Sequence, residues 1–180
     1  MNKVNLMINH DQEVVLYYDP SVVWGDGTHD STQACLEMMK RVGCEDKTII
    51  DFGTGTGILS IYAKKKGASK VVGIDVSPYA LEYARKNATA NDVDVEFILN
   101  NYNEDFDLKA DLIVTNFPPM SLKVLLPILK RNMKPSTKVI VSFPTYMNLK
   151  NELKVMGSDF KIIDEILKIE YGAYLLEEDK

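Results

Sequence analysis

The stretch Thr48-Ile49-Ile50-Asp51-Phe52-Gly53-Thr54-Gly55-Thr56-Gly57-Ile58-Leu59 decides the fold, because a short apolar run leads directly into three closely spaced glycines. The apolar run predicts a buried strand, and the glycines predict a sharp turn whose backbone can approach a ligand without a Cβ in the way. A second strand is expected to end at Gly73-Ile74-Asp75. A carboxylate at that point can accept hydrogen bonds from both hydroxyls of a ribose.

The spacing of the glycines separates two classes of cofactor. Counted from Gly53, the dinucleotide fingerprint G-x-G-x-x-G needs a glycine at position 58, where this chain has Ile58. The observed G-x-G-x-G, with Asp51 two positions ahead, is the pattern of S-adenosylmethionine (SAM) methyltransferases, whose ligand has no pyrophosphate to place on a helix N-terminus. The sequence therefore favours SAM, with S-adenosylhomocysteine as its product, over NAD.

Composition restricts the class of protein and of partner. With 180 residues and a net charge of −5, the chain fits one globular domain that is poorly suited to broad phosphate binding, so a protein partner is favoured over RNA. No apolar stretch is long enough to cross a membrane and no secretory leader is evident, which predicts a cytoplasmic protein. Cys35 and Cys44 are expected to be packing residues, and no metal site is predicted.

Alternating strand and helix patterns predict an α/β fold of the Rossmann-like, doubly wound type. A C-terminal antiparallel hairpin at 160–171 and 173–178 should complete a seven-stranded, mostly parallel sheet, an ending that dehydrogenase-type folds lack. We expect one domain over 1–180, with an N-terminal hairpin and loop at 1–27 and a catalytic core at 28–180. The core strands are expected at 48–52, 70–75, 94–99, 110–115 and 137–143, and the helices between them at 57–66, 78–90, 122–132 and 149–156.

A glycine-bearing loop lies between the expected N-terminal hairpin, with strands at 2–9 and 13–18, and the first core strand. It runs from Trp24 to Gln33, and its Asp30 and Gln33 have the spacing of a capping box that opens a helix extending to about Arg41. Its glycines would let the loop fold over a ligand. His29 lies in this loop and is a candidate general base, with a structural role as the alternative.

Several separated motifs between Val23 and Phe143 resemble the PrmA type of SAM methyltransferase, which methylates amino groups of ribosomal large-subunit protein eleven. The segment from Trp24 to Thr32 is similar to the family loop F-G-T-G-T-H-P-T-T, Asp51 to Leu59 to D-F-G-C-G-S-G-I-L, and Gly73 to Pro78 to G-I-D-I-D-P. The resemblance implies SAM contacts at Thr32, Gly53, Asp75 and Asn116. Together with the glycine turn and the residues after the second and third strands, the predicted cofactor-binding set is Thr32, Asp51, Gly53, Gly55, Gly57, Asp75, Val76, Asn101 and Asn116.

Two departures from the family bear on the substrate. The family has an N-terminal domain that recognises the ribosomal protein, and we expect this chain to lack it. After the fourth core strand the family has N-I-L, whereas this chain has Asn116-Phe117-Pro118-Pro119-Met120. That sequence is partway to the N-P-P-[YF] motif of enzymes that methylate adenine or the glutamine amide nitrogen.

Three functions are compatible with these sequence features. The first is N-methylation of a protein amine, with Asn116 orienting the amine and His29 as its base, and without a metal. The second is methylation of RNA, adenine or a glutamine amide, suggested by Asn116 and the two prolines. The third is a module that binds SAM without turning it over.

Overall fold

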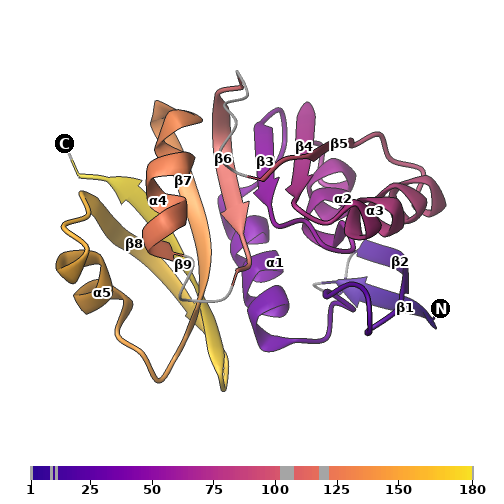
Figure 1. Cartoon of the computed structure of the whole chain (residues 1–180), viewed down its shortest axis with the longest axis horizontal. Coiled ribbons are helices and arrows are strands. Elements are labelled where there is room, and N and C mark those ends of the chain that lie inside the picture. Colours follow the sequence, from indigo (N-terminus) through magenta and orange to yellow (C-terminus); the bar gives the residue numbers. More distant parts are fainter. Residues whose placement is uncertain (1, 9, 11, 102–107, 118–121, 180) are drawn as a thin grey trace.

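A seven-stranded sheet forms the centre of the computed structural model, which describes residues 2–8, 10, 12–101, 108–117 and 122–179 (Figure 1). The strand order is β5-β4-β3-β6-β7-β9-β8. The first five strands in that order are parallel, and β9 runs antiparallel to both of its neighbours, which confirms the predicted fold. The strands are β3 Thr48–Phe52, β4 Lys70–Asp75, β5 Glu96–Leu99, β6 Ala110–Thr115, β7 Met133–Pro144, β8 Phe160–Leu167 and β9 Tyr171–Glu178.

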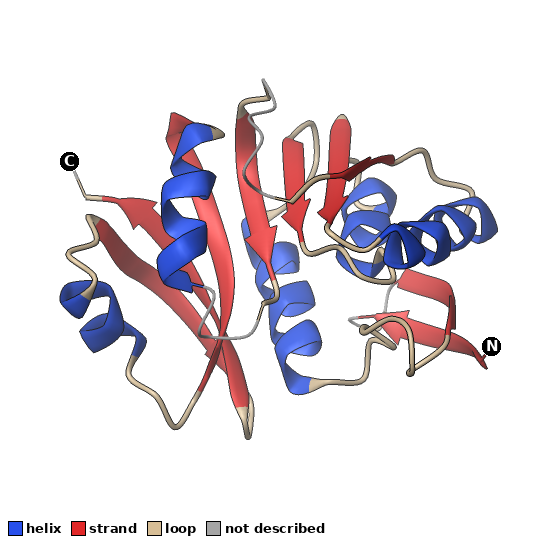
Figure 2. Cartoon of the chain, in the orientation of Figure 1, coloured by secondary structure: helices blue, strands red, loops and turns tan. Residues whose placement is uncertain are grey.

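Helices cover both faces of this sheet (Figure 2). One buried core joins the sheet to α1 (Asp30–Val42), α2 (Ile58–Lys65) and α3 (Pro78–Ala90). The other joins it to α4 (Leu122–Arg131) and α5 (Leu149–Val155). Because both faces are covered, the central strands are apolar on both sides, as their near-continuous Val, Ile and Leu content predicts.

The order of the strands reverses beside β3. After β3 the chain passes to β4 and β5 on one side, and then crosses to β6 on the other. Ligands of open α/β sheets bind beyond the carboxyl ends of the strands at such a reversal. In Figure 2 these ends point downward, toward the start of α1.

Two of the five predicted core strands differ in their bounds. β5 begins at Glu96, two residues later than predicted, and β7 begins at Met133 rather than at 137. The C-terminal hairpin also turns earlier than expected, since β8 ends at Leu167 rather than at 171 and β9 begins at Tyr171 rather than at 173. The early part of β7 was missed because it is polar and contains Pro135. It pairs with β6 across a register shift, where the Thr137 hydroxyl donates to the Ala110 carbonyl.

The predicted N-terminal hairpin is present as β1 (Asn2–Ile8) and β2 (Gln12–Tyr18), a two-stranded antiparallel sheet of its own. Its apolar side chains Ile8, Val14 and Leu16 are buried in the core that also holds α1 and α2. The hairpin lies below α3 in Figure 1. Among the residues described, no helix is both long and apolar enough to span a membrane.

Candidate active site

The turn after β3 has the left-handed backbone that its glycines predict. Gly53 and Gly55 have φ angles of 74° and 54°, where side chains with a Cβ are strained. A Cβ at Gly55 would also lie 2.7 Å from the carbonyl oxygen of Trp24. The amides of Gly53 and Thr54 donate to the Ile74 carbonyl at 2.8 and 2.9 Å, so the turn is fixed against the end of β4.

The carboxylate of Asp75 lies where β4 ends and holds the neighbouring backbone. Its Oδ2 accepts from the Gly55 amide at 2.9 Å and its Oδ1 from the Ser77 amide at 2.9 Å. A carboxylate has about four acceptor positions, so each oxygen retains capacity for a further donor such as a ribose hydroxyl. Val76 follows with a 53% exposed side chain, an apolar surface beside that carboxylate.

Asp51 is a buried carboxylate with one unsatisfied oxygen. Its Oδ2 accepts from the hydroxyls of Thr54 at 2.8 Å and Ser60 at 2.7 Å, whereas its Oδ1 has no hydrogen-bond partner. Burial raises the pKa of Asp51 to about 6, against the smaller opposing effect of the two hydroxyls. A buried anionic oxygen without a partner favours a cationic ligand, and SAM carries both an ammonium and a sulfonium. The residues present therefore fit this cofactor.

Asn116 and Thr32 connect the end of β6 to the first turn of α1. The Asn116 side-chain amide donates from Nδ2 to Thr32 Oγ1 at 3.0 Å, across a sequence separation of 84 residues. Thr32 is 2% exposed, so its hydroxyl is a fixed acceptor. Two residues that the sequence analysis proposed separately are thus joined at the carboxyl edge of the sheet.

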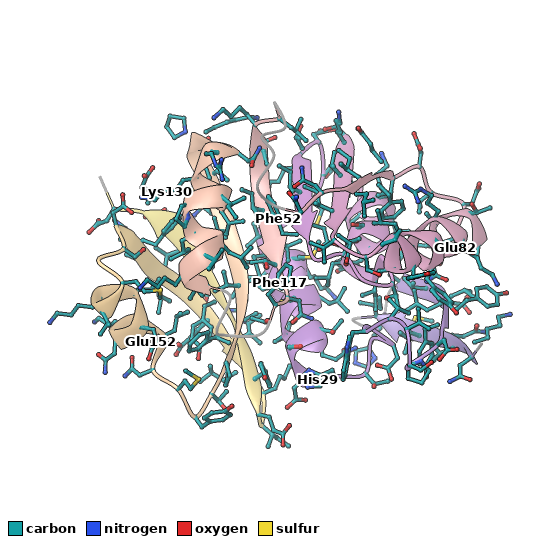
Figure 3. The ribbon with its side chains drawn as sticks, in the orientation of Figure 1. His29, Phe52, Glu82, Phe117, Lys130 and Glu152 are labelled. Atoms are coloured by element: carbon teal, nitrogen blue, oxygen red, sulfur yellow. The ribbon has the colours of Figure 1, made fainter. Side chains whose placement is uncertain are left out.

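His29 caps α1, and this corrects the predicted capping box. Its Nδ1 accepts the Ser31 amide at 3.2 Å, and the imidazole meets the ring of Tyr171 edge-on at 5.0 Å between centroids. Asp30 instead accepts from the Glu170 amide, and Gln33 donates to the Gly27 carbonyl. Figure 3 shows His29 at the lower end of α1, where the helix begins.

Phe117 occupies the space beside the first glycine of the turn. A Cβ at Gly53 would lie 2.4 Å from Cε2 of Phe117, so the ring covers the Gly53 backbone directly. Figure 3 places Phe117 at the middle of the molecule, near Phe52. The sequence analysis gave Phe117 no role of its own. The residues that follow it in the partial motif, Pro118 to Met120, lie outside the described residues.

The predicted cofactor residues therefore gather at one edge. Asn100 donates its amide to the Asp75 carbonyl at 3.1 Å, which places the exposed Asn101 immediately beyond the ends of β4 and β5. Asp51, the glycine turn, Asp75, Thr32 and Asn116 lie along the ends of β3, β4 and β6. Thr54 and Ser60, which hold Asp51, were not predicted, although hydroxyls three and nine residues after a buried carboxylate were a usable signal.

The two cysteines supply no reactive group to this edge, and the described residues contain no cluster that could bind a metal. Cys35 and Cys44 are free thiols in the core, and burial raises the pKa of Cys44 to about 11. Within the described ranges no group of three or more His, Cys, Asp or Glu side chains could hold a metal ion.

An open cavity of about 570 Å³ lies at the opposite edge, near the starts of β3 and β7. Its lining carries Arg41, Lys47 and Lys138 together with Asp46, Asp111 and Asp164. Arg41 is paired with Asp164 at 2.9 Å, and Asp111 is paired with Lys134 at 2.6 Å. The lining thus carries as many cations as carboxylates and presents no net charge to a ligand. The carboxyl edge remains the candidate active site.

Comparison with known proteins identifies the family to which the chain is similar. A family model described as ribosomal protein L11 methyltransferase (PrmA) matches residues 3–143. A ribosomal protein L11 methyltransferase of Pasteurella multocida is 43% identical over 119 residues, which cover 66% of this chain and 41% of that protein. A relative of the same name in Dictyoglomus turgidum is 38% identical over 134 residues, 74% of this chain and 45% of that protein. The chain thus spans less than half the length of these curated relatives.

Solved structures share the fold. The ribosomal protein L11 methylase of Lactobacillus delbrueckii subsp. bulgaricus superposes with a TM-score of 0.80 at 29% identity, covering 90% of this chain and 84% of that one. The T. thermophilus 16S rRNA methyltransferase RsmC, solved with AdoMet and guanosine, has a TM-score of 0.80 at 19% identity, covering 99% of this chain and 50% of that one. The second likeness concerns the fold alone. With its matched residues, its glycine turn and its Asp75 carboxylate, the chain belongs to the ribosomal protein L11 methyltransferase (PrmA) family.

Proposed function

We propose that this chain binds SAM at the carboxyl edge of its sheet and transfers the methyl group to an amine nitrogen of a protein. The observation that carries the proposal is the alignment of the glycine turn with Asp75, whose Oδ2 accepts the Gly55 amide at 2.9 Å. Membership of the PrmA family supports the same chemistry. The net charge of −5 favours a basic protein over a nucleic acid as the partner.

Each residue of the site has a defined task in this proposal. Asp75 would accept the ribose hydroxyls, and Asp51 Oδ1 would receive the positive charge of the amino acid part of the cofactor. Asn116, held by Thr32, would accept a hydrogen bond from the incoming amine through its oxygen. When bound, the cofactor supplies an electrophilic methyl group on a sulfonium.

Methyl transfer requires alignment more than acid or base strength. The nitrogen lone pair forms the new N–C bond while the C–S bond breaks, and its electron pair remains on sulfur as a neutral thioether. Positioning of two reactants can provide about 7–11 kcal/mol of the barrier reduction in favourable cases. The turn, fixed at Ile74 and Trp24, and the Asn116–Thr32 pair are the chain's means of positioning.

A protonated amine has no lone pair for this reaction, so a proton must leave before or during transfer. We propose Nε2 of His29 as its acceptor, in the tautomer whose Nδ1 hydrogen is donated to the Ser31 hydroxyl oxygen 2.7 Å away instead of Nδ1 accepting the Ser31 amide, because only the ring nitrogen without a hydrogen can take up a proton. The proton would pass from the amine nitrogen to Nε2 and then to water.

A planar nitrogen, in adenine, RNA or a glutamine amide, is the alternative acceptor. It rests on Asn116 and Phe117, the described part of the Asn116-Phe117-Pro118-Pro119 sequence. Phe117 covers Gly53, so an aromatic ring does lie beside the cofactor turn, as stacking against a planar group would require.

The first test is a calorimetric titration of the purified protein with SAM and with S-adenosylhomocysteine. We expect binding by the wild type and a loss of about tenfold or more in Asp75→Ala, since charge-assisted hydrogen bonds contribute roughly 1.5–3 kcal/mol. Asp94→Ala, an exposed carboxylate outside the site, serves as the matched control. No binding by the wild type would refute the proposal.

Turnover then separates the three functions. Labelled SAM is incubated with the protein and with either a basic protein fraction or an RNA fraction as acceptor. Label on amine nitrogens of protein supports the proposal, whereas label in RNA or on glutamine amides selects the planar nitrogen. Binding without labelling of any acceptor leaves a SAM-binding module.

A further inference from the structure

Two asparagines, Asn87 on α3 and Asn91 at its C-cap, hydrogen-bond the outer edge of the N-terminal hairpin as a neighbouring strand would. Asn87 Oδ1 accepts the Tyr17 amide at 2.7 Å, and its Nδ2 donates to the Tyr17 carbonyl at 3.0 Å. Asn91 repeats the arrangement with Val15, at 2.9 Å and 2.6 Å. The two side chains are buried, 0% and 8% exposed. The second edge of β2 is therefore satisfied by side-chain amides.

This arrangement is possible because the spacing of residues along the helix matches their spacing along the strand. Residues four apart on a helix lie on one face and are separated by about 6 Å along the axis. Residues two apart on a strand are separated by about 6.8 Å and direct their amides to the same edge. Asn87 and Asn91 therefore match Tyr17 and Val15, with β2 running antiparallel to α3.

Asn87 has a further contact that Asn91 does not share. Its Nδ2 also donates to the carbonyl of Thr56 at 2.9 Å, between the second and third glycines of the turn. The Thr56 amide in turn donates to the Trp24 carbonyl, in the loop that follows β2. One buried side chain thus joins the hairpin, the glycine turn and α3.

Apolar contacts make the same connection from the other strand. A Cβ at Gly27 would lie 2.3 Å from Cδ1 of Leu6 on β1 and 2.6 Å from Cδ1 of Ile58 at the start of α2. Gly27 is thus packed against Leu6 of the hairpin and against Ile58, the first residue of the helix that follows the glycine turn. The hairpin is in contact with two segments that form the edge of the site.

We propose that Asn87 is a positioning residue for the cofactor site, and that docking of the hairpin and binding of SAM are coupled through its contact with Thr56. The inference rests on the proposed function, because it concerns the affinity for SAM. Binding that fixes the glycine turn also fixes the Thr56 carbonyl, and through Asn87 the outer edge of β2. By reciprocity, loosening the hairpin must weaken SAM binding by the factor by which SAM tightens the hairpin.

The test compares Asn87→Ala with Asn91→Ala. Each removes one amide pair from β2, but only Asn87 contacts the turn. We expect SAM binding to weaken in both, more in Asn87→Ala, within the range of about 5- to 150-fold that is usual for such couplings. Thr89→Ala, on the exposed face of the same helix, should bind as the wild type does. Equal SAM affinity in folded Asn87→Ala and wild type would overturn the proposal.

Hydrogen exchange in the unmodified protein gives a second readout that a purely structural role would not change. The amides of Val15 and Tyr17 report the outer edge of β2 directly, and we expect SAM to slow their exchange. If SAM slows exchange at the glycine turn but not at Val15 and Tyr17, the proposed function stands and the coupling is refuted. Failure of the wild type to bind SAM would refute both.

Discussion

The ring of Phe117 lies directly on the backbone of Gly53, where a Cβ would be 2.4 Å from its Cε2 atom. The contact joins the residue that follows the end of β3 to a residue just beyond β6, on the two sides of the reversal in strand order. Two features therefore require glycine at position 53: its positive φ angle, and the aromatic ring that packs against its backbone.

Gly53→Ala should lower the free energy of unfolding by more than about 2 kcal/mol, because a left-handed non-glycine residue costs roughly 1–2 kcal/mol and the methyl group meets the ring as well. Urea denaturation measures the change. Phe117→Ala in the same background should restore part of the stability by removing the collision. If the double variant is no more stable than Gly53→Ala, the contact does not limit this position.

Thr32→Val should weaken SAM binding by about tenfold, since the isosteric side chain removes the acceptor that orients Asn116 and leaves its amide without this partner. Calorimetric titration measures the affinity. Thr32→Ser keeps the hydroxyl and should bind nearly as the wild type does. Unchanged SAM affinity in Thr32→Val would refute a role for the Thr32 hydroxyl in orienting Asn116.

Asp51 should make stability fall as the pH rises. Burial raises its pKa from 3.8 to about 6 in the folded state, so the folded protein binds the proton more tightly than the unfolded chain does. The penalty develops between about pH 4 and pH 6 and is complete above that range, at about 3 kcal/mol. The unfolding free energy of Asp51→Asn, minus that of the wild type, should rise by this amount from pH 4 to pH 7.

Asp111→Asn is the control of opposite sign when the same urea series is extended below pH 4. A hydrogen bond from Lys134 lowers the pKa of Asp111, so its stabilisation is present above the unfolded pKa and is lost as the pH falls. Its difference from the wild type should therefore change in the other direction. A flat difference for Asp51→Asn would contradict the raised pKa.

Variants of His29 can distinguish its role as the N-cap of α1 from its proposed role as a general base. Asparagine is a strong N-cap, so His29→Asn should keep the stability of α1, while His29→Ala should lose about 1 kcal/mol. The proposed base role predicts that methyl transfer falls in both variants at a fixed pH. Thermal unfolding and labelled-SAM turnover measure the two effects. Full turnover in His29→Asn would leave the cap as the only role of His29.

Much of the fold follows from local pattern. The strands β3, β4 and β6 begin and end where their apolar runs do, and Pro78 after Ser77 marks the start of α3. These signals are strong because a strand buried on both faces has little choice of residue, and because proline at the first helical position is favourable. Polar segments carry no such signal, which is why the first residues of β7 were missed.

Contacts between segments that are far apart in the sequence were harder to predict. Asp51, Gly53 and Asp75 were found because the site's chemistry restricts residue type at fixed short spacings. Asn87 and Asn91 read as ordinary positions of an exposed helix, and their partners lie 70 and 76 residues earlier. The usable signal was that asparagine is a poor helix former, and two of them four apart imply a shared partner.

The separation between β2 and its asparagine partners also sets an order of events during synthesis. Val15 leaves the ribosome 76 residues before Asn91, an interval of roughly 4 to 15 s at usual rates of elongation. Throughout that interval a hairpin of two seven-residue strands is only marginally stable alone. The hairpin is thus made before the asparagines that lock it, and a chaperone or protease would meet it with the edge of β2 still open.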